Sequence, residues 1–217
     1  MTTKTEPGTK HLTIKAPNLE TASFTIIGTS PYVQNKMSER AKEAMHEKQE
    51  AGSVAKKGQK RDPKDFEAAC WEASHKSDDG WYGIPCTSFR AALISACRMC
   101  GFKMTLAKLS IIVEPDGIER EKYGFYQLVK ITKGKPVYTE YAVKNASGVA
   151  DLRPRPMWEP GWEATVRITY DADQFTSADV ANLLLRAGLQ VGIGAGRMDS
   201  SDSAGCGWGS FKLAEKK

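Results

Sequence analysis

The stretch Gly83-Ile84-Pro85-Cys86-Thr87-Ser88-Phe89-Arg90-Ala91-Ala92-Leu93 predicts the end of an extended segment and the start of a helix. Pro85 closes the extended part, and Thr87 or Ser88 can cap the helix that follows. Apolar residues then recur at the spacing of one helix face, in the order Phe89, Ala92, Leu93, Ala96, Cys97 and Cys100. Arg90, Ile94 and Arg98 fall off this stripe, and Gly101 can end the helix. The pattern predicts a well-defined helix with one buried face.

Around this helix the chain alternates between strand and helix patterns. Strands are predicted at Leu12–Ile14, Ser23–Thr29, Leu106–Glu114 (with Leu109, Ile111 and Val113 on one face), Tyr126–Ile131, Pro136–Ala142, Trp162–Tyr170 and Trp208–Leu213. Helices are predicted at Ser38–Lys48, whose thin apolar stripe implies light packing, at Asp65–His75, and from a capping box at Thr176 to about Gly188. The core order is strand, helix, strand, strand, helix, strand, with long insertions after the first and third elements. This order is typical of α+β folds of the ferredoxin-like or RRM-like class.

A second stretch is rich in glycine. It runs Gly192-Ile193-Gly194-Ala195-Gly196-Arg197 and, after a polar run, Gly205-Cys206-Gly207-Trp208-Gly209. A backbone of this kind can expose consecutive N–H groups to a phosphate, and Arg197 can add charge. In that interpretation the glycines allow a ligand to approach the backbone closely, above all at Gly194 and Gly207. The alternative is a β-hairpin with glycine bulges and a Ser/Asp tip. The stretch is not a dinucleotide fingerprint, because the helix comes before it.

Length and composition place limits on the class of protein. The chain has 217 residues, of which 41% are hydrophobic and 26% charged, as in an ordinary soluble domain. It contains no apolar run of membrane-spanning length and no secretory signal, so no membrane association is expected. Cys97 and Cys100 are interpreted as small core residues rather than a redox or zinc pair. With five cysteines in no framework spacing, the sequence predicts no metal, no cofactor and a cytoplasmic location.

The basic residues are unevenly placed, although the net charge is only +5. Several crowd the polar segment Gln49–Lys64, namely Lys56, Lys57, Lys60, Arg61 and Lys64. We predict that this segment is a mobile basic loop, the alternative being a solvated linker. Arg153 and Arg155 flank Pro154, and residues 118–160 interleave aromatic and basic side chains. This mixture suits stacking on bases and neutralising phosphates, although cross-strand aromatic pairs would produce a similar pattern.

Three of these features resemble the RAMP proteins, the repeat-associated group that includes the Cas7 backbone subunits of CRISPR effectors. Gly83–Leu93 resembles their I-P-G-S-S-x-K-G-x-L-R segment, the glycine stretch resembles their G-rich loop, and Ile27–Pro31 lies where their first strand ends. Cys86 and Ala91 replace glycines of that segment, and Arg90 replaces its lysine. The resemblance covers Ser23–Gly28 and Gly80–Leu213. The chain also resembles solitary RAMP-type proteins of the kind expected in bacteriophage genomes.

The resemblance implies one RAMP-like domain over residues 1–217. It would carry a basic helical finger at about 30–79 and a thumb-like β insertion at about 115–160. It further implies binding to single-stranded RNA, or to single-stranded DNA, by copies that multimerise along the strand, with other CRISPR-type subunits as further partners. The predicted nucleic-acid contacts are Arg90, Arg98, Lys56, Lys57, Lys60, Arg61, Arg153, Arg155, Gly192, Gly194, Gly196, Arg197, Gly205 and Gly207.

Other classes of function stay open at this point. Some RAMP relatives cut RNA with a histidine or a loop aspartate. His11, His46 and His75 have no partner at a supporting spacing, and the sequence around Asp62 and Asp65 does not match those relatives. We therefore favour binding over a RAMP-type endoribonuclease, and predict no catalytic residue. A structural or inhibitory protein that copies a Cas7 surface, and a phage single-stranded DNA-binding or recombination protein, are the remaining alternatives.

Overall fold

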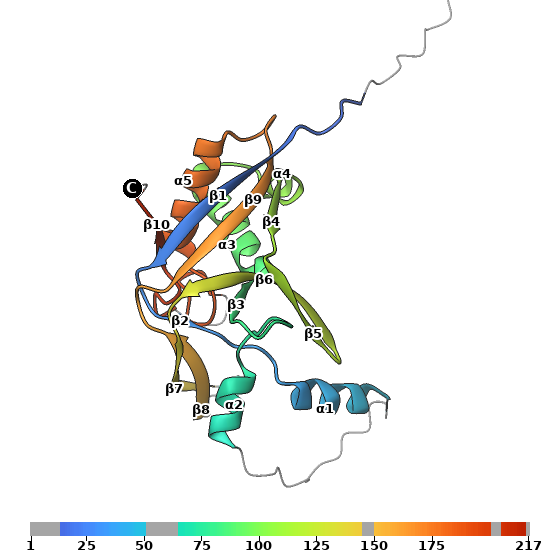
Figure 1. The fold of residues 1–217 in the computed structure, drawn as a ribbon, viewed down its shortest axis with the longest axis vertical. Helices are drawn as coiled ribbons and strands as arrows, with labels where there is room; N and C mark the ends of the chain where they lie inside the picture. The colour runs from blue at the N-terminus through green and yellow to red at the C-terminus, as the bar shows by residue number, and fades with distance from the viewer. Residues whose placement is uncertain (1–13, 51–64, 145–149, 201–204, 216–217) are drawn as a thin grey trace, which may run out of the picture.

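The main sheet of the protein has a ferredoxin-like core. The computed structural model describes residues 14–50, 65–144, 150–200 and 205–215. Four antiparallel strands lie in the order β10 (Phe211–Leu213), β1 (Leu19–Gly28), β9 (Glu163–Asp171) and β4 (Ile111–Glu114). Helices α3 (Cys86–Cys100) and α5 (Ser177–Arg186) pack behind these strands (Figure 1). The predicted fold class, α+β with a ferredoxin-like core and long insertions, is confirmed.

The strands of this core bury one face and expose the other. Along β9 the side chains of Ala164, Val166, Ile168 and Tyr170 are buried, and those between them face outward. Threonines on the open face pair across strands, for example Thr21 with Thr169 at 2.7 Å between hydroxyl oxygens. The buried face meets the apolar sides of α3 and α5 in one hydrophobic core. The core therefore lies on one side of the sheet only.

The first insertion lies between β1 and α3. It contains β2 (Tyr32–Val33), α1 (Glu39–Glu50), α2 (Phe66–Glu72) and β3 (Gly83–Pro85). Both predicted helices are confirmed; α1 buries no residue, and Asp65 caps α2 by accepting a hydrogen bond from the Ala68 N–H at 3.0 Å. The strand predicted at Leu12–Ile14 falls mostly outside the described residues, and Ile14 itself is not in a strand. The predicted mobile loop Gln49–Lys64 begins within α1, and its remaining residues 51–64 lie outside the described part of the chain.

The second insertion lies between β4 and β9. It contains β5 (Gly117–Glu121), β6 (Gly124–Lys133), β7 (Pro136–Lys144) and β8 (Ala150–Trp158). β6 extends the main sheet next to β9 and pairs with β3 and β5, while β7, β8 and β2 form a separate three-stranded sheet. The strands predicted at Tyr126–Ile131 and Pro136–Ala142 are confirmed within the longer β6 and β7.

The strand predicted at Leu106–Glu114 is wrong in its first half. Residues Met104–Ser110 form a helix, α4, and only Ile111–Glu114 form β4. Leu109 is 84% exposed instead of sharing the buried face with Ile111. A tertiary contact accompanies the helix: the Arg90 guanidinium donates to the carbonyl oxygens of Lys108 and Ile111, at 3.1 Å for the latter. The alternation predicted for a strand is therefore found only in Ile111–Glu114.

Two details of α3 also differ from the prediction. The N-cap is Pro85, which provides no side-chain hydrogen bond, and neither Thr87 nor Ser88 caps the helix. Ile94 is buried although it lies off the apolar stripe, because α4, β4, α5 and the segment after α5 cover α3 on several sides. Cys97 is buried as predicted, whereas Cys100 is exposed at the end of the helix, where Gly101 adopts φ 69°.

The capping box at Thr176 and Asp179 is confirmed, but Gly188 does not end the helix that follows. The chain continues as a π-helical turn, η1 (Ala187–Val191), and stops at Gly192. A side chain at Gly188 would overlap Phe211, so the glycine permits close packing against β10. The predicted strand Trp208–Leu213 is likewise shorter, with Trp208 in the preceding loop.

Ion pairs rather than apolar packing hold α1 against β5. Lys36 donates to Glu119 at 2.9 Å and to Glu121 at 2.6 Å, and Lys42 on α1 also pairs with Glu121. His75 Nδ1 lies 2.6 Å from Glu119 Oε2. Burial opposes ionisation of both carboxyls, yet the hydrogen bonds from His75 and Lys36 to Glu119, and from the two lysines to Glu121, hold both pKa values below their ordinary range.

Replacing Glu121 by Gln is expected to leave two largely buried lysines without their shared carboxylate. Losing one partner of a buried ion pair costs about 3–5 kcal/mol of folding free energy. The pKa of each carboxyl is depressed in the folded state. The stabilisation of the fold by the network should therefore be fully present above pH 4.5, the ordinary pKa of a glutamate, and should be lost as the pH falls through the lowered pKa values. Thermal unfolding between neutral pH and acid measures both effects.

The matched control is Glu43→Gln, which breaks the exposed pair between Glu43 and Lys122. Solvent screens an exposed ion pair, which therefore contributes little to stability, so this variant should unfold almost like the wild type. Similar losses for the two variants would contradict the role given to the buried network.

Candidate nucleic-acid interface

The antiparallel connectivity brings four segments to one end of the main sheet. β1 and β4 both run antiparallel to β9, so both point toward the end of the sheet where β9 begins. Near the end of β1 Ile27 lies opposite Glu163, whereas β4 ends partway along β9, with Glu114 opposite Arg167, and an insertion follows each strand. α3 leads into β4 and α5 follows β9, so the start of α3 and the loop after η1 lie at the same end (Figure 1). The two sequence motifs, about a hundred residues apart, therefore meet in space.

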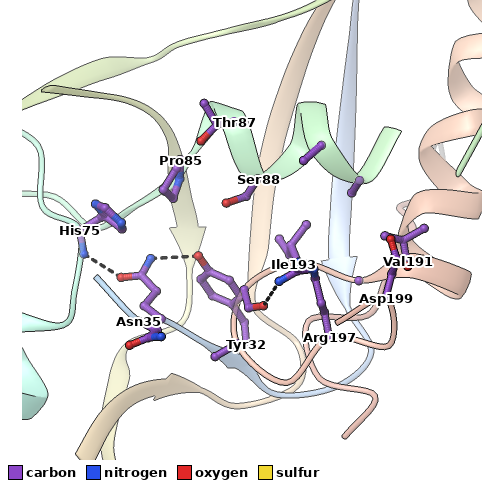
Figure 2. Close-up of a pocket in the computed structure, with 16 residues that line it drawn as sticks. Tyr32, Asn35, His75, Pro85, Thr87, Ser88, Val191, Ile193, Arg197 and Asp199 are labelled. Atoms are coloured by element: carbon purple, nitrogen blue, oxygen red, sulfur yellow. Dashed lines mark hydrogen bonds between the residues drawn. The ribbon is translucent and has the colours of Figure 1, made fainter. Parts of the chain in front are cut away.

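A pocket of about 410 Å³ separates these two motifs, and we call it the central pocket. Its walls come from the start of α3, the glycine-rich loop and β2 with the residues after it (Figure 2). The lining residues are Tyr32, Gln34, Asn35, His75, Pro85, Thr87, Ser88, Ala91, Ala92, Val191, Gly192, Ile193, Gly194, Ala195, Arg197 and Asp199. Apart from Arg197, Asp199 and His75, this lining is uncharged.

One wall of the central pocket is the N-terminus of α3. Since Pro85 offers no side-chain acceptor, the first amides of this 15-residue helix have no side-chain cap. The positive end of the helix dipole lies at the same place, which favours an anion. The hydroxyl-bearing residues Thr87 and Ser88, predicted as caps, line the pocket instead.

The opposite wall is the glycine-rich loop, which is folded onto β2 and is not a β-hairpin. The Ala195 N–H donates to the Val33 carbonyl at 2.9 Å, and the Gly209 N–H donates to Pro31 at 2.7 Å. All six glycines of the two triplets adopt positive φ, between 68° and 76°: Gly192, Gly194, Gly196, Gly205, Gly207 and Gly209. No strand pairing occurs in the described residues between η1 and β10. The hairpin interpretation is therefore wrong.

Contacts within the protein explain why glycine is needed in this loop. A Cβ atom at Gly194 would lie 2.5 Å from the Val33 carbonyl oxygen and 2.7 Å from the Tyr32 ring. At Gly196 it would lie 2.6 Å from the Trp208 ring, whereas at Gly207 nothing lies within 4 Å. The expected reason for Gly194, close approach of a ligand, is thus replaced by close approach of the protein's own backbone.

The loop also presents unused donors to the central pocket. Within the described part of the chain, the backbone N–H groups of Gly194 and Arg197 donate no hydrogen bond, and both residues line the pocket. The half-buried Arg197 side chain donates to the Gly194 carbonyl at 3.3 Å and has no carboxylate partner among the described residues. These groups form a wall rich in hydrogen-bond donors, beside which the Asp199 carboxylate interacts electrostatically with Arg197.

Two of the predicted arginine contacts have internal partners instead. Arg90 donates to backbone carbonyls of α4 and β4, as described above. Arg98 donates to both oxygens of Asp199 at 2.7 Å, and Ser95 also donates to Asp199. The Ser95 hydrogen bond, together with Arg98 and against the effect of burial, holds the pKa of Asp199 below its ordinary value. Arg98 and Asp199 therefore fasten the glycine-rich loop to α3.

The other predicted contacts lie apart from the central pocket or outside the described chain. Arg153 and Arg155 are on β8, in the smaller sheet, and Gly205 and Gly207 are not among the residues that line the central pocket. Lys56, Lys57, Lys60 and Arg61 lie outside the described residues.

Sequence reasoning missed the residues that shape the floor of the pocket. Gln34 is buried; its Nε2 donates to the Gly83 carbonyl at 2.7 Å and to the Tyr32 hydroxyl at 3.1 Å, and its Oε1 accepts from the His75 N–H at 2.7 Å. Burial raises the pKa of Tyr32, partly offset by Gln34, so the phenol stays neutral. Only the turn signal at Pro31-Tyr32 pointed to this region, because a buried glutamine leaves no sequence pattern.

The described residues give no indication of a metal centre or a membrane segment. No cluster of three or more His, Cys, Asp or Glu side chains with metal-binding geometry occurs among them. None of the helices in the described part of the chain combines the length and apolar character needed to cross a membrane.

Comparison with known proteins finds similarity among solved structures but not among protein families or curated sequences. No protein-family model matches the chain, and no curated protein matches its sequence. A chain of the cryo-EM structure of type III-B Cmr-beta bound to cognate target RNA is similar at a TM-score of 0.48 and 12% identity. The similarity covers 91% of the present chain, which spans 59% of the length of that chain. The fold assignment therefore depends on the strand order described above.

Gly194→Ala should destabilise the fold more than Gly207→Ala. Both glycines have nearly the same φ, 76° and 73°, so both variants bear the cost of a left-handed alanine, about 1–2 kcal/mol. Only Gly194→Ala also places a methyl group against Val33 and Tyr32. Urea unfolding of the two variants measures the difference, and equal losses of unfolding free energy would contradict the packing role of Gly194.

Proposed function

We propose that this protein binds single-stranded nucleic acid, with RNA as the foremost candidate, and that a backbone phosphate occupies the central pocket. The observation that carries the proposal is the convergence of the uncapped start of α3, the free amides of the glycine-rich loop and Arg197 around one pocket. Helix N-termini, exposed backbone amides and arginine are the groups that bind phosphates in proteins. No one of these groups suffices alone, and their meeting in space supports the proposal.

The charge pattern of the pocket favours an anion over a cation. Asp199, which also lines the pocket, is paired with the Arg98 guanidinium and accepts a hydrogen bond from the Ser95 hydroxyl. Arg197 has no such partner among the described residues. A phosphate would therefore meet unpaired donors, whereas a metal ion or ammonium group would meet a carboxylate that is already engaged.

The open face of the main sheet is a poor alternative site. RRM-like proteins bind RNA by stacking bases on aromatic side chains of that face. Here the outward-facing residues of β1, β4, β9 and β10 include no aromatic side chain, and threonine pairs occupy its centre. We therefore assign the bound nucleic acid to the end of the sheet, where the start of α3 and the glycine-rich loop meet.

We also propose that the chain is a RAMP-like protein with the domain organisation predicted from its sequence. The residues of about 30–79 would be a finger and those of about 115–160 a thumb of a single RAMP-like domain whose copies repeat along the strand with other CRISPR-type subunits. The narrower placement among solitary phage-type members stays a prediction. An endoribonuclease stays the alternative prediction: His75 lines the central pocket, and its Nδ1 contact with Glu119 orients the imidazole without excluding a catalytic role.

Arg197→Ala should weaken binding of oligouridine about tenfold, or about 1.4 kcal/mol. The slope of log affinity against log salt should become shallower by about 0.7, because one phosphate contact is lost. Lys212 is an exposed residue of β10 on the open face of the sheet. Lys212→Ala also removes one positive charge, and this control variant should bind normally. Fluorescence anisotropy at several salt concentrations measures both. Equal weakening by the two variants would refute the central pocket as the site.

Assembly along the strand gives a separate expectation. A single ferredoxin-like unit covers only a few nucleotides, so longer oligouridines should bind more copies. Light scattering of complexes with short, intermediate and long oligouridines should show a mass that grows with strand length. One copy per strand at every length would contradict multimerisation but not binding.

A further inference from the structure

Arg155 is a half-buried cation without a carboxylate partner. Its Nε is fully buried and donates no hydrogen bond to any described residue. One terminal nitrogen donates to the Pro154 carbonyl at 2.7 Å. The nearby carboxylate, Asp151, contacts the Nε of Arg153 at 3.4 Å instead. The guanidinium therefore keeps donors for which the described protein supplies no acceptor.

The surroundings of Arg155 are unfavourable for a lone charge. Burial lowers the pKa of Arg155, Tyr141 opposes this in part, and the neighbouring charge of Arg153 lowers the pKa further. Arg153 and Arg155 are two residues apart on β8, so both project from the same face of the small sheet. A buried unpaired cation destabilises a fold unless an anion pairs with the cation. Its chemical complement is an anion with two or more acceptor oxygens.

Two aromatic rings border these arginines. Tyr141 on β7 is the cross-strand partner of Arg153, and its ring lies 5.2 Å from that of Trp208, nearly perpendicular at 83°. Trp208 belongs to the glycine-rich loop and packs against Gly196, where a Cβ would clash with its ring. The arginine pair on β8 is thus joined to the wall of the central pocket through Tyr141 and Trp208.

We propose that Arg153, Arg155, Tyr141 and Trp208 form a second nucleotide subsite for the strand whose phosphate occupies the central pocket. Arg155, assisted by Arg153, binds a phosphate, and the Tyr141–Trp208 pair contacts the adjoining base or ribose. The subsite rests on the proposed nucleic-acid binding. A phosphodiester with its base uses both the cations and the rings, whereas an acidic peptide would use the cations alone. The aromatic pair therefore favours the nucleotide.

Arg155→Met tests the subsite because it keeps an apolar stem and removes the charge. The affinity for a long oligouridine should fall about tenfold, as expected when a hydrogen-bonded charge contact is lost. The salt slope should become shallower by about 0.7. Tm should stay the same or rise, since no protein carboxylate is left unpaired. Arg155→Lys retains the charge and should keep the salt slope while losing part of the affinity.

The outcomes separate this inference from the proposed function. If Arg197→Ala weakens binding and Arg155→Met does not, the subsite is wrong and the central pocket stands. A lower Tm with unchanged affinity for Arg155→Met would show a structural arginine and overturn the subsite. Competition by polyglutamate as effective as that by oligouridine would overturn the nucleotide assignment in favour of an acidic peptide. If the wild type binds no oligouridine at several salt concentrations, the proposed function fails and the subsite fails with it.

Discussion

The close contact between the glycine-rich loop and β2 is the constraint on which the end of the molecule that carries the central pocket depends. Gly194 lies against the Tyr32 ring and the Val33 carbonyl at a distance that no side chain would permit. The same approach brings Ala195 into hydrogen-bond range of Val33. Because the loop must lie this close, its backbone takes the left-handed turns that glycine accepts without strain. Arg197 and Trp208 are placed by this path, and with them the wall of the central pocket and the aromatic border of β8.

The charged residues of this structure fall into two groups, those paired within the protein and those without a carboxylate partner. Glu119 and Glu121 are satisfied by Lys36, Lys42 and His75, and Asp199 is satisfied by Arg98 and Ser95. These pairs fasten α1 to β5 and the loop to α3, so they serve the fold. Arg197 and Arg155 have no carboxylate partner among the described residues, and both lie beside the glycine-rich loop or its aromatic neighbours. Arg197 lines the central pocket beside the start of α3, and this position is more consistent with a phosphate ligand than with a structural role.

The topology explains how two long insertions can be attached to one end of a small core. In the ferredoxin-like order both insertions, the start of α3 and the loop before β10 emerge at one end of the sheet. The open face of the core strands carries paired threonines. The inserted strands β7 and β8 form their own sheet with β2. They therefore leave the alternating buried and outward-facing residues of β9 undisturbed.

Local patterns in the sequence determined the elements whose signal is periodic or chemical. The stripe from Phe89 to Cys97 predicted α3, the alternation along 162–170 predicted β9, and Thr176 with Asp179 predicted the cap of α5, because period and capping depend on neighbours a few residues apart. Tertiary structure decided the rest. Arg98 meets Asp199 across 101 positions and Gln34 meets Gly83 across 49, distances over which a single sequence carries no register. The helix α4 in place of a strand, the burial of Ile94 and the pairing of Arg90 follow from such distant contacts. Which predicted arginines have internal partners and which stay free for a ligand is therefore a property of the fold alone.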